Sequence, residues 1–384
     1  MNINAFGLEI FNELCYNDDD NKIDENVILS PMSFSLAFSM LLSGSSEEIK
    51  AALKNELKFF VDKDALKRLV RVSDVLNSNN GSMKIEFDNY IFAPKYLKQI
   101  VSKFGLEVKG ACKRKGQKSK FDKTTGKSEK AIKNWVKYCT NEKLKCLSIN
   151  IDRKTTYVIA STIYFKLNWL NASEPYFTMY DKYYFNPDKN SNVQMTVHER
   201  SCCLNSFNRK RFRSLSIPLE KKDFSMLIIL PFDKFGLDDV IAKLDVETIK
   251  KLKELENIER KPVFVNVPKF KIEYKVDLRT ILRSKEVDIS FDKESASINA
   301  MFIESHRRPD CRLYSSEVIH KAVFETTEEG KQADAPLERY PNQRDFIVDH
   351  PFAFMILYSS LEKLLRFREF GNTLSFQGYL KHRL

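Results

Sequence analysis

A nearly unbroken apolar run, Tyr157-Val-Ile-Ala-Ser-Thr-Ile-Tyr-Phe165, places the strongest constraint on how this 384-residue chain can fold. A strand with apolar side chains on both sides is typical of a sheet that is covered on both faces. Ser225-Met-Leu-Ile-Ile-Leu-Pro231 has the same character. We therefore expect sheets whose central strands are buried on both faces.

Helical patterns precede most of the strand patterns. Apolar periodicity predicts helices over about 3–15, 46–57, 64–76 and 128–140. Ser30-Pro31-Met32-Ser33 opens a further apolar helix through Leu42, with Pro just inside its start and Gly44 just past its end. Strands are expected over 83–92 and, from alternation, over Val263–Ile272. Without regular βαβ alternation the chain reads as α+β. Without a Gly-, Ser- or Pro-rich linker we expect one domain over residues 1–384.

The net charge of +11 permits contact with acidic polymers or anionic surfaces but does not require it. Zinc-finger spacing, a basic zipper and RNA-binding aromatic signatures are all missing from the sequence, so nucleic acid is not an expected partner. The sequence also contains no apolar run of 18 residues, so we expect no transmembrane segment. We expect a soluble monomer.

Seven scattered cysteines fit a reducing compartment better than a disulfide framework. For vicinal Cys202-Cys203 we expect packing and one exposed thiol rather than a redox centre. The first fourteen residues have no basic start and no small-residue cleavage site, hence no secretory signal. The expected location is the cytoplasm, or the exterior or cell surface by a route without a classical signal peptide.

Sequence patterns typical of enzymes and metal sites are missing. The sequence has no Gly-x-Ser-x-Gly, His-Glu-x-x-His or Cys-x-x-Cys motif, and its five histidines are far apart. Gly126-Lys127-Ser128 fails as a phosphate loop because Phe121 stands where a glycine is needed. We expect no enzyme, no catalytic residues, no metal and no small-molecule cofactor.

The stretch from Lys331 to Val348 has no helical or strand periodicity. It follows the strand pattern around His320-Lys-Ala-Val-Phe324 and precedes Asp349-His-Pro-Phe352. A long irregular loop inside a compact domain is usually functional or disordered. We expect an exposed loop tethered between two strands.

Several segments resemble landmarks of the serpin family, proteins that trap serine proteases and sometimes cysteine proteases. In chain order they are Asn26–Ser33, Ile132–Val136, Ile163–Trp169, Ser225–Pro231, Val267–Ile272, Phe324–Gly330 and Asp349–Phe352. The start without a signal is similar to the intracellular ovalbumin-like branch. The odd cysteine count and the Lys-rich insertions leave the source open, and a parasitic flatworm is one candidate.

The resemblance implies a serpin fold with three β-sheets, about eight or nine helices and an exposed reactive-centre loop over about 328–348. Two of the landmarks, Ser225–Pro231 and Val267–Ile272, look like core strands of the smaller sheets. A target protease cuts the loop, which then inserts as a new central strand of the main sheet and drags the acylated protease with it. The implied hinge of this movement is Glu328, Glu329, Gly330, Lys331, Gln332, Ala333, Asp334, Ala335 and Pro336.

The resemblance also implies a hydrogen-bonded cluster beneath the strands that part, made of Ser30, Ser33, Ser161 and His320. The family usually has Asn where Ser161 stands. Because a serine hydroxyl is shorter, we expect a water molecule to complete the network.

In inhibitory members the spacing from the hinge glutamate to the residue before the cut is nearly constant. Sixteen residues after Glu328 stands Arg344, so the reactive bond is predicted to be Arg344-Asp345. Arginine before the cut suits a pocket with a buried carboxylate, which indicates a trypsin-like serine protease as the partner. Arg339 is the rival site, but it leaves an inserting strand five residues shorter.

Four departures favour an alternative, a non-inhibitory serpin that serves as a binding or storage protein. Lys331 is predicted to face inward with Ala333 and Ala335, where inhibitors usually carry a small residue. Pro336 removes one ladder donor from a central strand. Asp345 is atypical after the cut, and the segment beyond it is about four residues shorter than in familiar members.

The densest basic run extends from Lys109 to Lys123 and includes Lys113, Arg114, Lys115, Lys118 and Lys120. It predicts either a solvated loop or a site for a heparin-like glycosaminoglycan, which would bind in a salt-sensitive way. A weaker basic group is Lys67, Arg68 and Arg71. Residues 373–384 read as a C-terminal extension that either docks as an amphipathic turn or is disordered.

Overall fold

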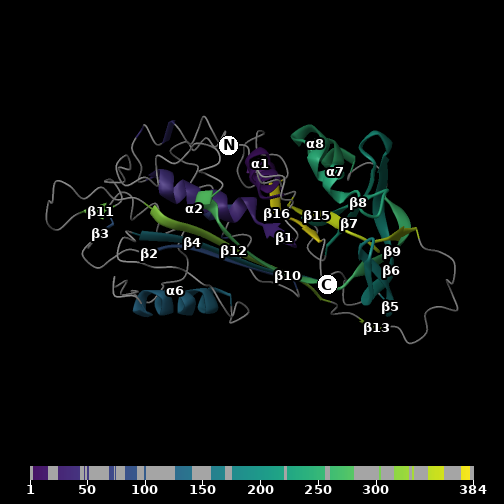
Figure 1. Cartoon of the computed structure of the whole chain (residues 1–384), viewed down its shortest axis with the longest axis horizontal. Helices are drawn as coiled ribbons and strands as arrows, with labels where there is room; N and C mark the ends of the chain where they lie inside the picture. Colours follow the sequence, from purple (N-terminus) through teal and green to yellow (C-terminus); the bar gives the residue numbers. More distant parts are fainter. Residues whose placement is uncertain are drawn as a thin grey trace.

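The structure is a computed structural model. It describes residues 3–15, 25–43, 47, 50–51, 69–72, 74, 83–92, 99–100, 126–140, 157–168, 175–219, 223–255, 260–280, 302–303, 315–327, 331–332, 345–358 and 373–380. Its α+β architecture confirms the predicted class (Figure 1).

The described α-helices are α1 (Ile3–Cys15), α2 (Pro31–Ser43), α6 (Gly126–Cys139), α7 (Leu237–Ala242) and α8 (Val246–Leu255), with one 3-10 turn at Asn208–Lys210. The predicted total of eight or nine helices also covers residues outside the described part. The start of α2 follows from its sequence, because Ser30 Oγ accepts a hydrogen bond from the Ser33 backbone N–H at 3.2 Å. Pro31 then occupies the first helical position, where its missing N–H has no consequence.

A four-stranded sheet has the order β10-β12-β4-β2. Its strands are β10 (Lys271–Asp277), β12 (Ser315–Thr327), β4 (Tyr157–Asn168) and β2 (Lys84–Phe92). Both outer pairings are antiparallel, whereas β12 and β4 run parallel in the middle. Helix α2 lies on one side of this sheet and α6 on the other (Figure 1).

A ten-stranded sheet forms the other part of the molecule. Its main path is β1-β16-β15-β8-β7-β6-β5-β13, and β9 and β14 join it beside β6. The strands are β1 (Val27–Leu29), β5 (Pro175–Asn186), β6 (Lys189–Phe207), β7 (Phe212–Pro218), β8 (Phe224–Pro231), β9 (Lys261–Pro268), β13 (Lys331–Gln332), β14 (Phe346–Ile347), β15 (Phe352–Tyr358) and β16 (Thr373–Leu380). A small third sheet pairs β3 (Gln99–Ile100) with β11 (Phe302–Ile303).

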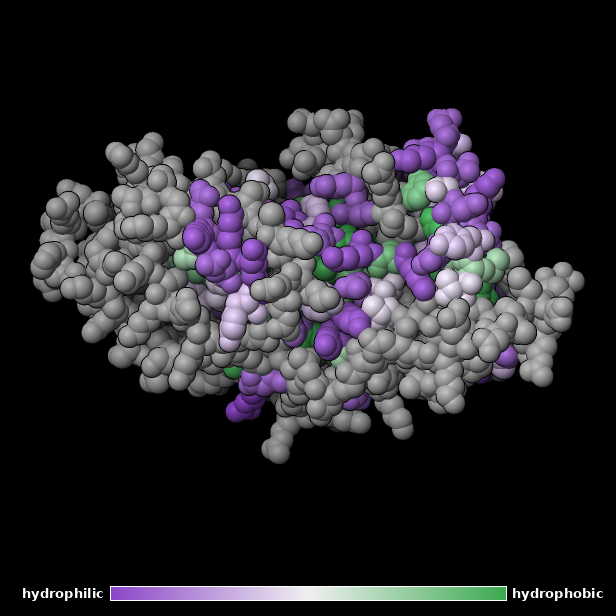
Figure 2. Space-filling view, turned by 90° about the horizontal axis from the view of Figure 1, so that it is seen from below, coloured by the Kyte–Doolittle hydropathy of each residue, from purple (hydrophilic) through white to green (hydrophobic). Residues whose placement is uncertain are grey.

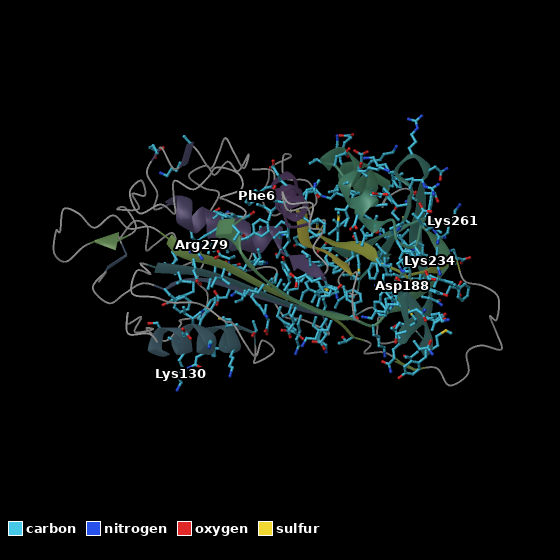
Figure 3. All side chains as sticks on the ribbon, in the orientation of Figure 1. Phe6, Lys130, Asp188, Lys234, Lys261 and Arg279 are labelled. Carbon is cyan, nitrogen blue, oxygen red and sulfur yellow. The ribbon has the colours of Figure 1, made fainter. Side chains whose placement is uncertain are left out.

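The four-stranded sheet is covered on both faces, as the apolar run in β4 predicts. On the α6 side, Trp135 packs edge-on against Phe92 with ring centroids 5.4 Å apart. On the α2 side, Phe165 of β4 stacks on Phe324 of β12, with ring centroids 5.6 Å apart. Lys130 points away from the sheet on the outer side of α6 (Figure 3). From below, the described surface is mostly hydrophilic with smaller apolar areas (Figure 2).

Four sequence predictions are corrected by the structure. The single strand expected over Val263–Ile272 is two strands, because β9 ends at Pro268 and β10 begins in the other sheet at Lys271. The same break means that Val267–Ile272 is not one core strand of a smaller sheet. The irregular loop expected to reach Val348 instead contains β13, and its far end is the paired strand β14.

The third and fourth corrections concern the C-terminal region and the cysteines. Residues 373–380 form β16 between β15 and β1, so they belong to the body and are neither an amphipathic turn nor a disordered extension. Cys202 and Cys203 are both buried, at 0% and 3% exposure, so neither is an exposed thiol. The cause is that β6 passes from its β9 partner to its β7 partner between these two residues.

Candidate functional site: the seam between β4 and β12

The central pairing of the four-stranded sheet joins two parallel strands, and we call this pairing the seam. It runs in register from Glu317 opposite Val158 to Thr327 opposite Asn168, and an irregularity separates this run from the Ser315–Tyr157 pair. Parallel pairing is slightly less stable per residue than antiparallel pairing. The seam is therefore the weaker place for this sheet to part.

On the α2 side, Ser30, Ser33, Ser161 and His320 form one hydrogen-bonded cluster, as the family resemblance implied. The Ser30 backbone N–H donates to His320 Nε2 at 3.2 Å, so Nε2 carries no proton. Nδ1–H then donates to Ser161 Oγ at 3.0 Å. Ser161 Oγ lies 2.8 Å from Ser33 Oγ. The cluster thus links the start of α2 to both strands of the seam.

The cluster fixes the ring of His320 as a neutral tautomer. The ring is fully buried, and burial lowers the pKa of His320 to about 3. The water expected beside Ser161 is not needed for these contacts, because the hydroxyl reaches both Ser33 and His320 directly. The role of the cluster in opening the sheet stays a prediction.

Asn89, which was not predicted from the sequence, lies opposite Ser161 in the β2–β4 register. Asn89 is 0% exposed, and its side-chain amide has no hydrogen-bond partner among the described residues. The available signal was its place in the alternation of β2. Ile85 and Ile91 lie on the same face and pack into the main core, so a polar residue between them interrupts an apolar stripe.

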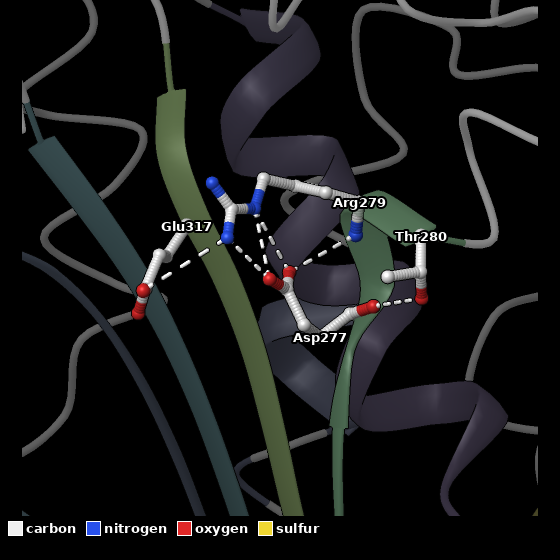
Figure 4. Close-up of polar contacts among 4 residues, drawn as sticks. All are labelled: Asp277, Arg279, Thr280 and Glu317. Atoms are coloured by element: carbon white, nitrogen blue, oxygen red, sulfur yellow. Dashed lines mark hydrogen bonds and ion pairs between the residues drawn. The ribbon is translucent and has the colours of Figure 1, made fainter. Parts of the chain in front are cut away.

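The far side of β12 is tied to β10 by charged side chains. Arg279 Nε donates to Asp277 Oδ2 at 2.9 Å, and Arg279 Nη2 lies 3.9 Å from Glu317 Oε1 of β12 (Figure 4). Four residues after Glu317 on β12, Lys321 Nζ lies 3.5 Å from Glu273 Oε2 of β10. These contacts tie β10 and β12 together as a pair.

The loop that leaves β12 is held at both ends by the ten-stranded sheet. After Thr327 the chain reaches Lys331 and Gln332, which pair in parallel with Pro175 and Tyr176. At the far end Phe346 pairs with Val265 and is 0% exposed. Lys331, Gln332, Phe346 and Ile347 are therefore strand residues and not part of an irregular loop.

Asp345, the residue after the predicted cut, is anchored to the body. Its Oδ2 accepts a hydrogen bond from the Phe264 backbone N–H at 3.0 Å. Its carbonyl oxygen accepts another from Arg213 Nη1 at 3.4 Å. The arginine also lies over the Phe346 ring, 5.3 Å from its centroid. A protease that cuts before Asp345 has to displace these contacts.

The Asp349-His350 pair forms a second anchor beyond the loop. His350 Nδ1 lies 2.6 Å from Asp349 Oδ1, and Nε2 lies 3.0 Å from the Pro231 carbonyl oxygen. Lys234, labelled in Figure 3, forms an ion pair with Asp349 Oδ2 at 3.1 Å. Burial raises the pKa of Asp349, but the bonds with His350 and Lys234 outweigh it and hold the pKa below its usual value.

The remaining predicted site residues lie outside the described part. They are the reactive-bond residue Arg344, the rest of the hinge (Glu328, Glu329, Gly330, Ala333, Asp334, Ala335 and Pro336), and the basic residues Lys113, Arg114, Lys115, Lys118 and Lys120. Within the described ranges, no three His, Cys, Asp or Glu side chains come together in a way that could hold a metal ion. In the same ranges, every helix is too short or too polar to cross a bilayer.

Comparison with known proteins gives consistent matches. The family model described as Serpin (serine protease inhibitor) matches residues 1–367. Leukocyte elastase inhibitor from Sus scrofa is 27% identical over 379 residues, covering 94% of this chain and 95% of the relative. Serpin B4 from Homo sapiens is 27% identical over 374 residues, covering 91% of this chain and 94% of the relative. Both relatives are mammalian and give no support to a flatworm source.

Two solved structures share the fold. Uncleaved ovalbumin superimposes with a TM-score of 0.82 at 20% identity, covering 100% of both chains. A structure described as a tumour suppressing serpin superimposes with a TM-score of 0.80 at 20% identity, covering 99% of this chain and 98% of the other. At this identity the likeness concerns the fold alone.

Proposed function

Because this chain belongs to the serpin family, we propose that it is a suicide-substrate inhibitor of trypsin-like serine proteases. The proposed reactive bond is Arg344-Asp345, and the proposed trap is insertion of the cut loop into the seam. The observation that carries this proposal is the direct parallel pairing of β4 with β12.

Strand direction explains why insertion is favourable. A segment that turns back after Thr327 runs antiparallel to β12, and because β12 and β4 are parallel it is antiparallel to β4 as well. One parallel pairing is then replaced by two antiparallel pairings, which adds a ladder of hydrogen bonds. The inserted state is thus the more stable one.

The far anchor explains why insertion waits for cleavage. In the uncut chain the loop is held at Asp345 and in β14, so its C-terminal half cannot travel along the seam. Cleavage before Asp345 frees one end of the loop. The uncut protein is then kinetically trapped relative to the inserted state, and a barrier sets the lifetime of the uninserted state.

The direct test mixes the protein with a small deficit of trypsin and separates the products on a denaturing gel. The proposal expects an adduct that survives heat and detergent, and a released C-terminal fragment that begins at Asp345. Cleavage at that bond without an adduct, with trypsin still active, would contradict the inhibitory function.

A non-inhibitory binding or storage protein is the second candidate. The anchored Asp345 and the buried Phe346 favour it, since proteases bind several extended residues on both sides of a cut. Lys331 and Pro336 favour it as well, through their expected effect on insertion. Whether the cut loop inserts discriminates between the two candidates.

Replacing Lys331 by threonine is expected to raise the trapping rate at least about tenfold, since an unpaired ammonium costs several kcal/mol to bury even when its stem reaches towards solvent. The measurement is the rate of adduct formation with trypsin. Gln332→Thr is the matched control, because the neighbouring side chain points to the opposite face. Equal rates for Lys331→Thr and the unmodified protein would show that Lys331 does not face inward.

The basic run at Lys113, Arg114 and Lys115 supports a further proposal, binding of a heparin-like polyanion. Neutralising these three residues removes three positive charges that would bind sulfate or carboxylate groups, so elution from a heparin column is expected at clearly lower salt. Neutralising Lys67, Arg68 and Arg71 is the control, since the weaker patch carries the same number of charges. Elution at unchanged salt after the first set of changes would contradict the site.

We also propose a monomer in a reducing compartment such as the cytoplasm. The four cysteines of the described part, Cys15, Cys139, Cys202 and Cys203, are buried and form no disulfide. Thiols outside disulfides are typical of proteins in a reducing compartment and support this location.

A further inference from the structure

A hydrogen bond between Tyr164 and Glu325 crosses the seam on the α6 side. The phenol of Tyr164 in β4 donates to Glu325 Oε2 of β12 at 3.1 Å. Tyr164 lies opposite Val323, and Glu325 lies opposite Lys166, so the bond runs diagonally between the strands. It lies on the face opposite the Ser161–His320 contact.

The surroundings of this bond make it strong and keep the phenol protonated. Tyr164 is 2% exposed and packs into the apolar cluster beneath α6. Burial, the Glu325 carboxylate and the negative charge of Glu86, which lies opposite Tyr164 on β2, raise the pKa of Tyr164 well above its usual value. Glu325 itself is half-buried. A protonated phenol that donates to a carboxylate makes a charge-assisted hydrogen bond, roughly twice as strong as a neutral one.

The bond also lies where an inserting strand would enter. Glu325 is two residues before Thr327, where β12 ends and the loop begins. At the end itself, Thr327 Oγ1 donates to the Leu167 carbonyl oxygen at 3.3 Å. The Ser161–His320 contact lies deeper, five residues before Glu325 along β12. An entering strand therefore meets the Tyr164–Glu325 bond before it reaches the buried cluster.

We propose that the hydrogen bond between Tyr164 and Glu325 is a catch that sets how fast the loop inserts. This inference rests on the proposed trapping function. The catch exists only while β4 and β12 are neighbours, because an inserted strand moves them about 4.8 Å further apart. The catch stabilises the uninserted state and adds to the barrier for opening the seam.

Tyr164→Phe tests the catch while keeping the aromatic ring in the core. Hydrogen exchange of the uncleaved protein reports seam opening directly, at Ile163–Leu167 of β4 and Val323–Thr327 of β12. We expect exchange there to become about tenfold faster, which corresponds to about 1.4 kcal/mol and fits a hydrogen bond to a charged acceptor. Spontaneous heat inactivation is expected to accelerate by a similar factor, because the same opening precedes insertion.

Two further variants separate the catch from general damage. Tyr274→Phe removes a buried tyrosine hydroxyl from β10 in the same sheet, away from the seam, and is expected to leave exchange in β4 and β12 unchanged. Glu325→Gln keeps an acceptor oxygen, so its exchange rates in β4 and β12 are expected to stay within about threefold of those in the unmodified protein.

The outcomes distinguish this inference from the proposed function. Unchanged exchange in Tyr164→Phe, with a normal trypsin adduct from the unmodified protein, overturns the catch and leaves the inhibitory function standing. Faster exchange without any adduct from the unmodified protein overturns the inhibitory function, while the contact still holds the seam. Faster exchange in Tyr164→Phe, together with a larger share of cleaved Tyr164→Phe chains that end in the trypsin adduct, supports both the catch and the inhibitory function.

Discussion

Arg344→Ala is expected to slow the trapping of trypsin by at least about a hundredfold, the rate change that corresponds to about 3 kcal/mol. The reason is the pocket of the partner protease. A guanidinium pairs with a buried carboxylate there, and removing it leaves that carboxylate unpaired at a cost of about 2–5 kcal/mol. The measurement is the second-order rate of trypsin inactivation, followed with a small substrate.

Arg339→Ala is the matched control because it makes the same change five residues earlier in the loop. Its rate is expected to stay within about threefold of the unmodified protein, since it removes no pocket contact. Slow trapping by Arg339→Ala with a nearly unchanged rate for Arg344→Ala would show that the reactive bond is Arg339-Tyr340. That outcome has a physical basis, since a cut after Arg339 leaves residues 340–344 between the bond and the anchored Asp345.

The parts of the fold that depend on local pattern were predictable from the sequence. The helix that begins at Pro31 carries its own start and stop signals, and its bounds agree with them. The double-sided burial of β4 follows from its composition alone. The contact between Ser161 and His320 joins residues 159 positions apart, and only the family resemblance predicted it.

The parts that sequence reasoning missed depend on which strands become neighbours. The apolar positions change from odd (Val263, Val265, Val267) to even (Phe270, Ile272) across Pro268, which marks a local break, but nothing local shows that β9 and β10 belong to different sheets. Phe346 looks like a loop residue until its pairing with Val265 is known. The Tyr164–Glu325 bond depends on the register of two distant strands, and a one-residue slip would turn these side chains to the other face.

Acidification provides the second prediction with a large effect. Two histidines, His198 and His320, are buried as neutral rings. Burial lowers the pKa of both to about 3, and the positive charge of Arg200 adds to the shift at His198. In the unfolded chain each ring titrates near about pH 6.5.

The sign follows from which state binds the proton. Above about pH 6.5 both states are neutral and the rings do not affect folding. As the pH falls below that value, the unfolded chain gains protons that the native protein cannot accept, so stability is lost. For pH 5 relative to pH 8 the loss is about 2 kcal/mol for each ring. Protonation of His320 Nε2 would also remove the acceptor that holds the Ser30 N–H.

His198→Leu isolates one ring without touching the Ser161–His320 contact. Neither ring nitrogen of His198 has a hydrogen-bond partner among the described residues, so leucine is expected to be tolerated and to stabilise the protein. The free energy of unfolding, measured with urea across this pH range, is expected to fall by about 2 kcal/mol less than in the unmodified protein.

Thr196→Val is the matched control on the same face of β6. Its hydroxyl is also buried without a partner in the described ranges, but it does not titrate. Valine should therefore shift the stability curve equally at every pH, whereas leucine at position 198 should flatten it. Parallel curves for His198→Leu and the unmodified protein would show that His198 takes up its proton in the native state as readily as in the unfolded chain.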